Sequence, residues 1–457
     1  MANNLTVSYK GNTIHTASAS GSATLNTEGK YMEDDVSLSY TFDGGGSGSA
    51  GFSDVNFYDY DGTIVQSYSA SDFASLSAMP DNPTHSGLTA QGWNWSLADA
   101  KAYVASYGKL NIGQMYVTSD GKTRIYIHLE EGRLAPYLGI AINGTATVDW
   151  GDGTTSTVTG SSTSTVVNTQ HSYATAGNYV IAIAVSGSMA LVGNTSYGSQ
   201  VLWKNSTTGS LNRAYQNAIQ KVEIGFNTSI GSTAFGICYS LASVTIPSGV
   251  TSIGDYAFGL CNSLASVTIP STVTSIGNNA FYSCYSLASV TIPSGVTNIG
   301  ANAFQNCYSL ASVTIPSTVT SISSYAFYSC NSLASVTIPS TVTSIGNNAF
   351  GTCHSLSSVV IPSGVTSIDG YAFSTCHSLS SVVIPDSVTS IGGYAFNNCY
   401  GLGFIKFTRT TPPTVSNSNA WTNIPTDCII YVPSGTLSAY TSATNYPSSS
   451  TYTYVEY

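Results

Sequence analysis

Residues 241–261 read LASVTIPSGVTSIGDYAFGLC, and close copies of this unit follow one another at intervals of 23 residues. A phenylalanine, a cysteine and a leucine keep this interval throughout. The repeated cysteines are Cys238, Cys261, Cys284, Cys307, Cys330, Cys353, Cys376 and Cys399. A period of roughly 20 to 29 residues with such apolar spacing is typical of a solenoid, in which each unit buries its apolar edge only against its neighbours.

Each unit is predicted to contain a strand followed by a second wall. Val244 and Ile246 alternate with Ser243 and Thr245, so the first pair points into the core and the second pair outward. The later apolar positions form the opposite wall, with each cysteine as a small buried hydrophobe. With an irregular first unit at Ile219, we count nine strands, which at about 4.8 Å per rung make a stack roughly 40 Å long.

Both ends of the repeat depart from the pattern. Lys221 and Glu223 in the first unit are charges that we expect on a terminal cap facing water. At the other end, the proline pair at 412–413 interrupts the repeat. The solenoid is therefore predicted over residues 219–411, followed by a C-terminal cap over 412–457.

The cysteines are predicted to be free thiols. There are nine of them, an odd number without a C-x-x-C pair, so neither a zinc site nor a thioredoxin-type motif is expected. Equivalent cysteines on adjacent rungs point the same way and rarely reach the torsion of a disulfide. Buried free thiols favour folding in a reducing compartment.

Composition limits the class of protein. Of the 457 residues only 7% are charged, against about 25% in ordinary globular proteins. Ser, Thr, Asn, Tyr and 43 Gly replace the charges, so we expect a mainly β, multidomain protein. With 12 basic against 22 acidic residues, nucleic acid is a poor partner. The first residues show no secretory leader, and no apolar run suits membrane insertion.

Five segments are predicted before the solenoid. They are an N-terminal β module (1–43), a Gly/Ser linker (44–51), a β-rich module with one short helix that begins after Ser96 (52–142), a small β-sandwich (143–190) and a connector (191–218).

The repeat resembles a known family. The unit SLASVTIPSGVTSIGDYAF at 240–258 and its copies look like the BspA-type leucine-rich repeats of bacterial surface proteins, gut-bacterial prophages and some protists. This resemblance implies a leucine-rich-repeat solenoid that serves adhesion or recognition and carries no chemistry of its own.

Two further resemblances concern the first half of the chain. TVDWGDGT at 147–154, followed by His171 and Tyr173, is similar to the PKD domain, a small β-sandwich that implies a spacer role. Residues 57–76, 87–109 and 123–144 look like a module of Firmicute prophage tail proteins. That resemblance implies attachment to a virion through the N-terminal module.

Comparison of the repeats with one another shows two variable outer rows. Both draw on Tyr, Asn, His, Gly, Ser and Asp, residue types that are common in recognition surfaces. The candidate ligand-binding residues of the first row, directly after the cysteines, are Tyr239, Tyr285, Tyr308, Asn331, His354, His377 and Tyr400. Those of the second row, before each Ala-Phe pair, are Tyr256, Tyr325, Tyr371 and Tyr394. The alternative is sequence drift at exposed positions.

The strands offer a second uncharged surface. Ser243, Thr245 and their equivalents form rows of hydroxyl groups on the outside of the stack. Such a face suits the docking of sugars, with tyrosine rings for stacking, or the ordering of water.

No pattern for catalysis is present. The chain has no G-x-S-x-G elbow, no H-E-x-x-H pair and no phosphate-binding loop, so we expect neither an enzyme nor a cofactor. The stretch 59–62 resembles the start of a calcium loop, and Asp149 with Asp152 suggests an ion site, but turns explain both better. His354 and His377 are either a metal pair or plain surface, and we favour surface.

These observations predict a phage or prophage tail protein that recognises a host cell-surface protein or glycan through its solenoid. Its N-terminal module would contact other virion proteins, and the chain would fold in the bacterial cytoplasm before assembly into the virion. The alternative is a BspA-type adhesin on the bacterial cell surface. A homotrimer stays open, because no heptad segment demands one.

Overall fold

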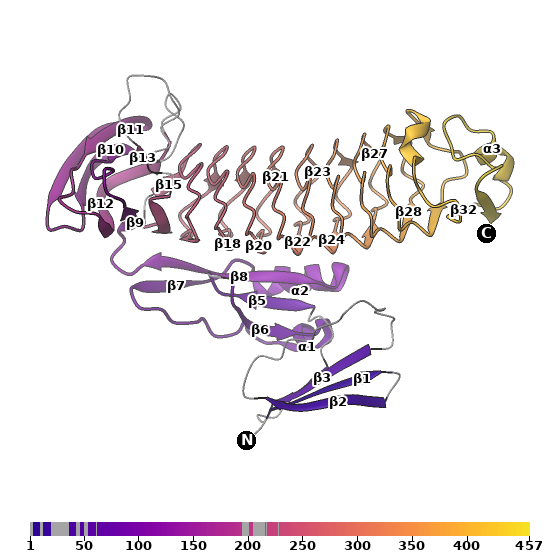
Figure 1. Ribbon diagram of the computed structural model, residues 1–457, viewed down its shortest axis with the longest axis horizontal. Coiled ribbons are helices and arrows are strands. Elements are labelled where there is room, and N and C mark those ends of the chain that lie inside the picture. Colours follow the sequence, from indigo (N-terminus) through magenta and orange to yellow (C-terminus); the bar gives the residue numbers. More distant parts are fainter. Residues whose placement is uncertain are drawn as a thin grey trace.

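The computed structural model describes residues 3–9, 12–19, 36–42, 46–49, 54–60, 62–193, 201–203, 215, 217–226 and 228–457. The chain is mainly β, as predicted (Figure 1). Its first four strands form an antiparallel sheet of order β2-β1-β3-β4: β1 (Asn3–Tyr9), β2 (Asn12–Ala19), β3 (Val36–Phe42) and β4 (Gly46–Ser49). Residues 46–49, expected in a linker, are thus a strand paired with β3.

Residues 54–118 form a small α/β module with its own core. Its elements are β5 (Val55–Tyr58), β6 (Ile64–Tyr68), α1 (Ala70–Ser75), β7 (Leu88–Trp93), α2 (Leu97–Tyr107) and β8 (Leu110–Thr118), with sheet order β6-β5-β8-β7. The predicted helix is α2: the Ser96 hydroxyl caps it by accepting from the Asp99 amide, and it ends at the left-handed Gly108. Helix α1, with Ser69 as its cap, was not predicted.

The next strands form a sheet that caps the solenoid. They are β9 (Thr123–Leu129), β10 (Tyr137–Asp149), β11 (Thr155–Gln170), β12 (Gly177–Leu191) and β13 (Leu202–Trp203). The boundary expected between residues 142 and 143 lies inside β10. Strand β12 pairs in parallel with the first rung of the solenoid, from Met189 beside Thr228 to Leu191 beside Ile230. We call this sheet the capping sheet.

The capping sheet corrects one expectation about the first repeat. Strand β9 pairs with the strand of Lys221 and Glu223 on the side that we expect to be exposed, and Lys221 is only half-exposed. Glu223 is only 5% exposed. Its carboxylate lies 2.9 Å from the Lys221 amine and accepts a hydrogen bond from the Tyr126 hydroxyl. The ion pair is therefore part of a junction between two sheets.

Each solenoid turn contributes two short parallel strands. The first set contains the nine predicted strands: β14 (Ile219–Glu223), β16 (Ser243–Thr245), β18 (Ser266–Thr268), β20 (Ser289–Thr291), β22 (Ser312–Thr314), β24 (Ser335–Thr337), β26 (Ser358–Val360), β28 (Ser381–Ile384) and β30 (Phe404–Phe407). We call its outer side the strand face. The second set is β15 (Thr228–Ile230), β17 (Ser252–Ile253), β19 (Ser275–Ile276), β21 (Asn298–Ile299), β23 (Ser321–Ile322), β25 (Ser344–Ile345), β27 (Ser367–Ile368), β29 (Ser390–Ile391) and β31 (Thr414–Val415).

The C-terminal segment continues the stack beyond the proline pair. Strands β32 (Ile429–Val432) and β33 (Thr453–Glu456) extend the sheet of β30 in parallel. The turn η2 (Ser418–Trp421) precedes β32, and helix α3 (Leu437–Thr441) lies between β32 and β33. The Trp421 ring stacks on Phe396 at 5.4 Å, so it takes the place of the next phenylalanine and closes the core.

Stacked side chains fill the interior of the solenoid. Successive phenylalanine rings lie parallel with centroids 5.2 to 5.5 Å apart, for example Phe281, Phe304 and Phe327. All nine cysteines are buried and free, which confirms the prediction of free thiols. From Cys261 to Cys399, each repeated thiol points at the carbonyl of a phenylalanine of the preceding turn, as Cys284 does with Phe258 at 3.1 Å.

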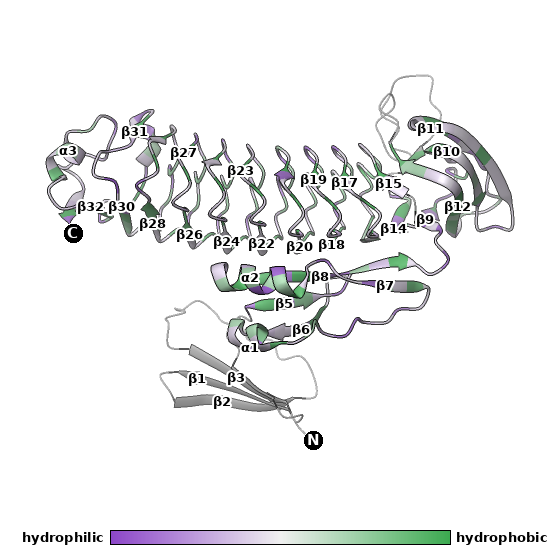
Figure 2. Cartoon of the chain, turned by 180° about the vertical axis from the view of Figure 1, so that it is seen from behind, coloured by the Kyte–Doolittle hydropathy of each residue, from purple (hydrophilic) through white to green (hydrophobic). Residues whose placement is uncertain are grey.

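The α/β module packs against the strand face. Strand β8 contacts β16, β18, β20 and β22. Views from both sides place the module alongside the middle of the solenoid, with β8 next to its strands (Figure 1, Figure 2). Within the described residues, no helix combines the length and the apolar character needed to cross a membrane.

Candidate functional site

The first predicted row lies on the outside of the solenoid. Tyr285, Tyr308 and Tyr400 are 38%, 40% and 56% exposed. The rings of Tyr285 and Tyr308 stack face to face, with centroids 5.0 Å apart and planes 9° apart. Parallel strands in register hold these residues one rung apart, so the backbone sets the ring positions. A preordered ladder of rings loses little side-chain entropy when it binds a partner.

The asparagines of this row have a different role. The amide of Asn331 donates to the carbonyls of Thr352 at 2.8 Å and of Ser329 at 3.3 Å. Asn262 makes the equivalent bonds three turns away. These amides satisfy turn carbonyls, so Asn331 is less available to a ligand than the tyrosines.

Two histidines continue the ladder. His354 and His377 stack with centroids 4.6 Å apart, and Tyr400 follows His377 at 5.0 Å. Burial lowers the pKa of His354, and the neighbouring His377 lowers it further. A zinc site needs three or four ligands. Among the described residues no three His, Cys, Asp or Glu side chains group in that way.

The second row occupies a strained turn. Tyr256, Tyr325, Tyr371 and Tyr394 have φ values of 54°, 59°, 58° and 62°. Left-handed backbone costs about 1–2 kcal/mol for most residues, and Asn tolerates it best after Gly. Other repeats do carry Asn at this position, namely Asn279, Asn302 and Asn348. Four tyrosines thus replace the residue that the backbone prefers, which supports a role for their rings.

Tyr282 and Tyr328 join the two rows and were missed at the sequence level. Tyr282 packs edge to face on Tyr256 of the second row, with ring centroids 6.5 Å apart. Partial burial raises the pKa of Tyr308 in the first row, and Tyr285, Tyr282 and Tyr328 raise it further, so these rings are close neighbours. Other repeats carry Gly, Gln, Ser or Asn at the position of Tyr282. Comparison of the repeats with one another therefore could have identified this third variable row.

We call these rings together the aromatic surface. Its members are Tyr256, Tyr282, Tyr285, Tyr308, Tyr325, Tyr328, His354, Tyr371, His377, Tyr394 and Tyr400. Tyr239, also predicted, is half-buried at the start of the first row. Between residues 241 and 400 the sequence has no Lys or Arg and only three Asp. Contacts on this surface must therefore be apolar or hydrogen-bonded, and its binding is expected to tolerate salt.

We expect the strand face to be an open surface, but the structure shows part of it covered. Thr245, Thr268 and Thr291 are only 2% to 7% exposed, because the α/β module covers them. The amide of Asn94 donates to the Ile269 carbonyl and to the Thr291 hydroxyl, both at 3.1 Å. Towards the C-terminus the face is open: Val360 is 78% exposed and Val383 42%.

Helix α2 and the residues just before it add polar contacts to this docking. The Tyr103 hydroxyl donates to the Ile315 carbonyl at 3.0 Å, and the Trp95 indole donates to the Ile292 carbonyl at 3.3 Å. From β8, Asn111 donates to the Ser312 hydroxyl at 3.0 Å. Rows of strand hydroxyls and carbonyls thus serve as an internal docking site.

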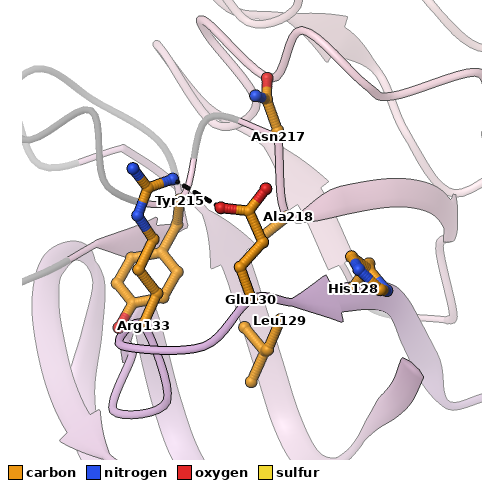
Figure 3. Close-up of a pocket in the computed structure, with 7 residues that line it drawn as sticks. All are labelled: His128, Leu129, Glu130, Arg133, Tyr215, Asn217 and Ala218. Carbon is orange, nitrogen blue, oxygen red and sulfur yellow. Dashed lines mark hydrogen bonds and ion pairs between the residues drawn. The ribbon is translucent and has the colours of Figure 1, made fainter. Parts of the chain in front are cut away.

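The remaining candidates are structural. Asp59 is buried and lies 2.7 Å from His85, while Asp152 lies 2.6 Å from His171. The hollow between Glu130, Arg133 and Tyr215 has a volume of about 10 Å³, and an ion pair of 3.1 Å between Glu130 and Arg133 lies across it (Figure 3). That space suits one water molecule at most.

Comparison with known proteins agrees with the repeat geometry. The model of the BspA type leucine rich repeat region matches six copies, over residues 228–341 and 320–431. No curated protein matches the chain.

Several solved structures are similar. A leucine-rich repeat protein from Bacteroides ovatus is 26% identical, with a TM-score of 0.39, over 45% of this chain and 57% of that one. The chain thus spans little more than half of that protein. A leucine rich repeat protein from T. pallidum is 31% identical, with a TM-score of 0.35, over 40% of this chain and 83% of that one. A leucine rich cell surface protein from Faecalibacterium prausnitzii is 24% identical, with a TM-score of 0.21, over 48% and 90%.

The family match falls on the turns that carry the cysteine and phenylalanine ladders and the aromatic surface. Residues 228–431 of this chain therefore form a BspA type leucine rich repeat region.

Proposed function

We propose that the chain is a non-catalytic recognition protein that binds a cell-surface protein or glycan through the aromatic surface. The observation that carries this proposal is the ladder of exposed rings held one rung apart, as at Tyr285 and Tyr308. Aromatic rings with few charges give large contact area at low entropic cost. The repeat family fits this role, because its members are often surface adhesins.

Binding of the labelled full chain to intact gut Firmicute cells tests the proposal. The double variant Tyr285→Ala, Tyr308→Ala should lose about tenfold in affinity, because it removes two neighbouring anchors from the ladder. A matched control, Thr320→Ala with Thr343→Ala, removes two exposed side chains without a ring and should bind like the parent. Equal adsorption by both double variants would show that the aromatic surface does not bind the cells.

A phage or prophage tail is one setting for this recognition, and a bacterial cell surface is the other. The nine free, buried thiols favour the phage setting, because they suit folding in a reducing cytoplasm before assembly. In that setting the N-terminal sheet β1–β4 would attach the chain to other virion proteins. The chain could then assemble as a trimer.

Immunogold labelling of induced bacterial cultures separates the two settings. Antibodies against the full chain should label tail tips of released particles if the protein belongs to a virion. Label confined to the cell envelope would identify an adhesin instead. Light scattering of the purified chain measures whether it is a trimer.

A further inference from the structure

A cleft lies where the α/β module and the solenoid diverge. The module docks through β8 and α2, whereas β5 and β6 lie farther out in its sheet. Between these outer strands and the solenoid strands β22 and β24 is a cleft of about 460 Å³. Sites for small ligands commonly have about 300–1,000 Å³. The cleft is separate from the aromatic surface and does not depend on its proposed role.

The two walls of the cleft are faces of β-sheets. Pairing of Asn56 with Ser67, and of Tyr58 with Ile64, places these four side chains on the same face of the module. The opposite wall belongs to the strand face and carries hydroxyl groups. Its lining residues include Ser312, Thr314, Ser335 and Thr337.

Several polar groups in the cleft have capacity to bind a ligand. In the described part of the chain, the hydroxyls of Thr314, Ser335 and Thr337 have no hydrogen-bond partner, and Lys109 has no ion-pair partner. Asp54 also lines the cleft and accepts from the Ala70 amide. One acid and one base leave the cleft without net charge. This balance favours an uncharged ligand that is rich in hydroxyl groups.

Apolar surface adjoins these polar groups. Ile64 is 52% exposed on one wall. On the other, Val360 follows in the strand next to Thr337 and is 78% exposed. A pyranose ring has the matching character, with hydroxyl groups at its edge and C–H groups on its face. An extended peptide would instead need unpaired backbone N–H and C=O groups at a strand edge, and the walls of this cleft present side-chain faces of sheets.

We propose that this cleft binds a short, uncharged oligosaccharide between the module and the solenoid. The strand hydroxyls and Lys109 would hydrogen-bond the sugar edge, while Tyr58, Ile64 and Val360 would contact its face. The exposed continuation of the strand face over β26 and β28 would accommodate further sugar units.

Calorimetric titration of the full chain with malto-, cello-, manno- and chito-oligosaccharides, and with oligogalacturonate as an acidic probe, tests this proposal. At least one neutral probe should bind. Ser335→Trp should fill the cleft and weaken that binding by about tenfold or more, and Thr337→Val should weaken it several-fold by removing one hydroxyl. Ser321→Trp, at an exposed serine of β23 in the other strand set, is the matched control.

Circular dichroism establishes that each variant is folded. Absence of binding to every neutral probe, binding of the acidic probe alone, or unchanged affinity in folded Ser335→Trp would each overturn the proposal. The pair Tyr285→Ala, Tyr308→Ala should leave oligosaccharide binding unchanged, so the cleft and the aromatic surface are tested separately.

Discussion

Phe304 illustrates how single residues stabilise the solenoid. It is fully buried between Phe281 and Phe327, with ring centroids 5.2 and 5.5 Å away. Replacement by Ala leaves a cavity that stiff neighbouring turns cannot fill, so Phe304→Ala should lower the free energy of unfolding by about 3–5 kcal/mol. In the same repeat, Tyr308→Ala should lower it by less than about 1 kcal/mol, because that ring is exposed. Urea denaturation compares the two, and equal losses would contradict a packed core.

The buried thiols make stability depend on alkaline pH. Burial raises the pKa of Cys284 and Cys353 to about 12, whereas an unfolded thiol titrates near about 8.5. Between these values the native state keeps protons that the unfolded state releases, so the stabilisation is complete below about pH 8.5 and is lost as the pH rises towards 12. Cys284→Ala should reduce the slope of stability against pH by about 1.4 kcal/mol per unit. Urea midpoints at a series of pH values measure this slope. The plot of stability against pH should be steeper for the parent than for the variant.

At the scale of elements, the contact between β8 and the strand face depends on close approach. A Cβ on Gly113 would lie 2.6 Å from the Thr268 side chain and would also meet the Thr291 hydroxyl. Gly113→Ala should therefore loosen the docked module and increase hydrogen exchange in β8, β18 and β20. Gly249→Ala is the control, because its added Cβ has no neighbour within 4 Å. Equal exchange in the two variants would show that the module does not depend on this fit.

The elements show how far the sequence could predict the fold and the candidate site. The period located the first strand set, the buried cysteines and the two variable rows, since each depends on spacing alone. The docking of the module was out of reach, because Asn94, Gly113 and the strand hydroxyls form no apolar pattern. The strained backbone of Tyr256 and the amide bonds of Asn331 likewise depend on turn geometry, which repeat spacing does not specify.

For the whole molecule, the capping sheet and the solenoid form one unit. A single hydrophobic core extends from Ile125 to Tyr440. Strand β9 covers β14, and β12 covers β15. The division expected between a spacer and a repeat domain is absent here, because strand pairing and core packing cross it. Solenoids need terminal caps to keep their end strands from pairing with other chains.

This continuity predicts the behaviour of fragments. A fragment of residues 219–457 lacks β9 and β12, so both strand sets would begin with unpaired edges above an exposed core. It should aggregate or form oligomers at concentrations where a fragment of residues 54–457 stays a single species. Size-exclusion chromatography with light scattering measures the difference, and thermal unfolding should show a lower midpoint for the shorter fragment. A shorter fragment that is monomeric, with the same midpoint as the longer one, would mean that the first repeat caps itself and that the capping sheet is only an appended domain.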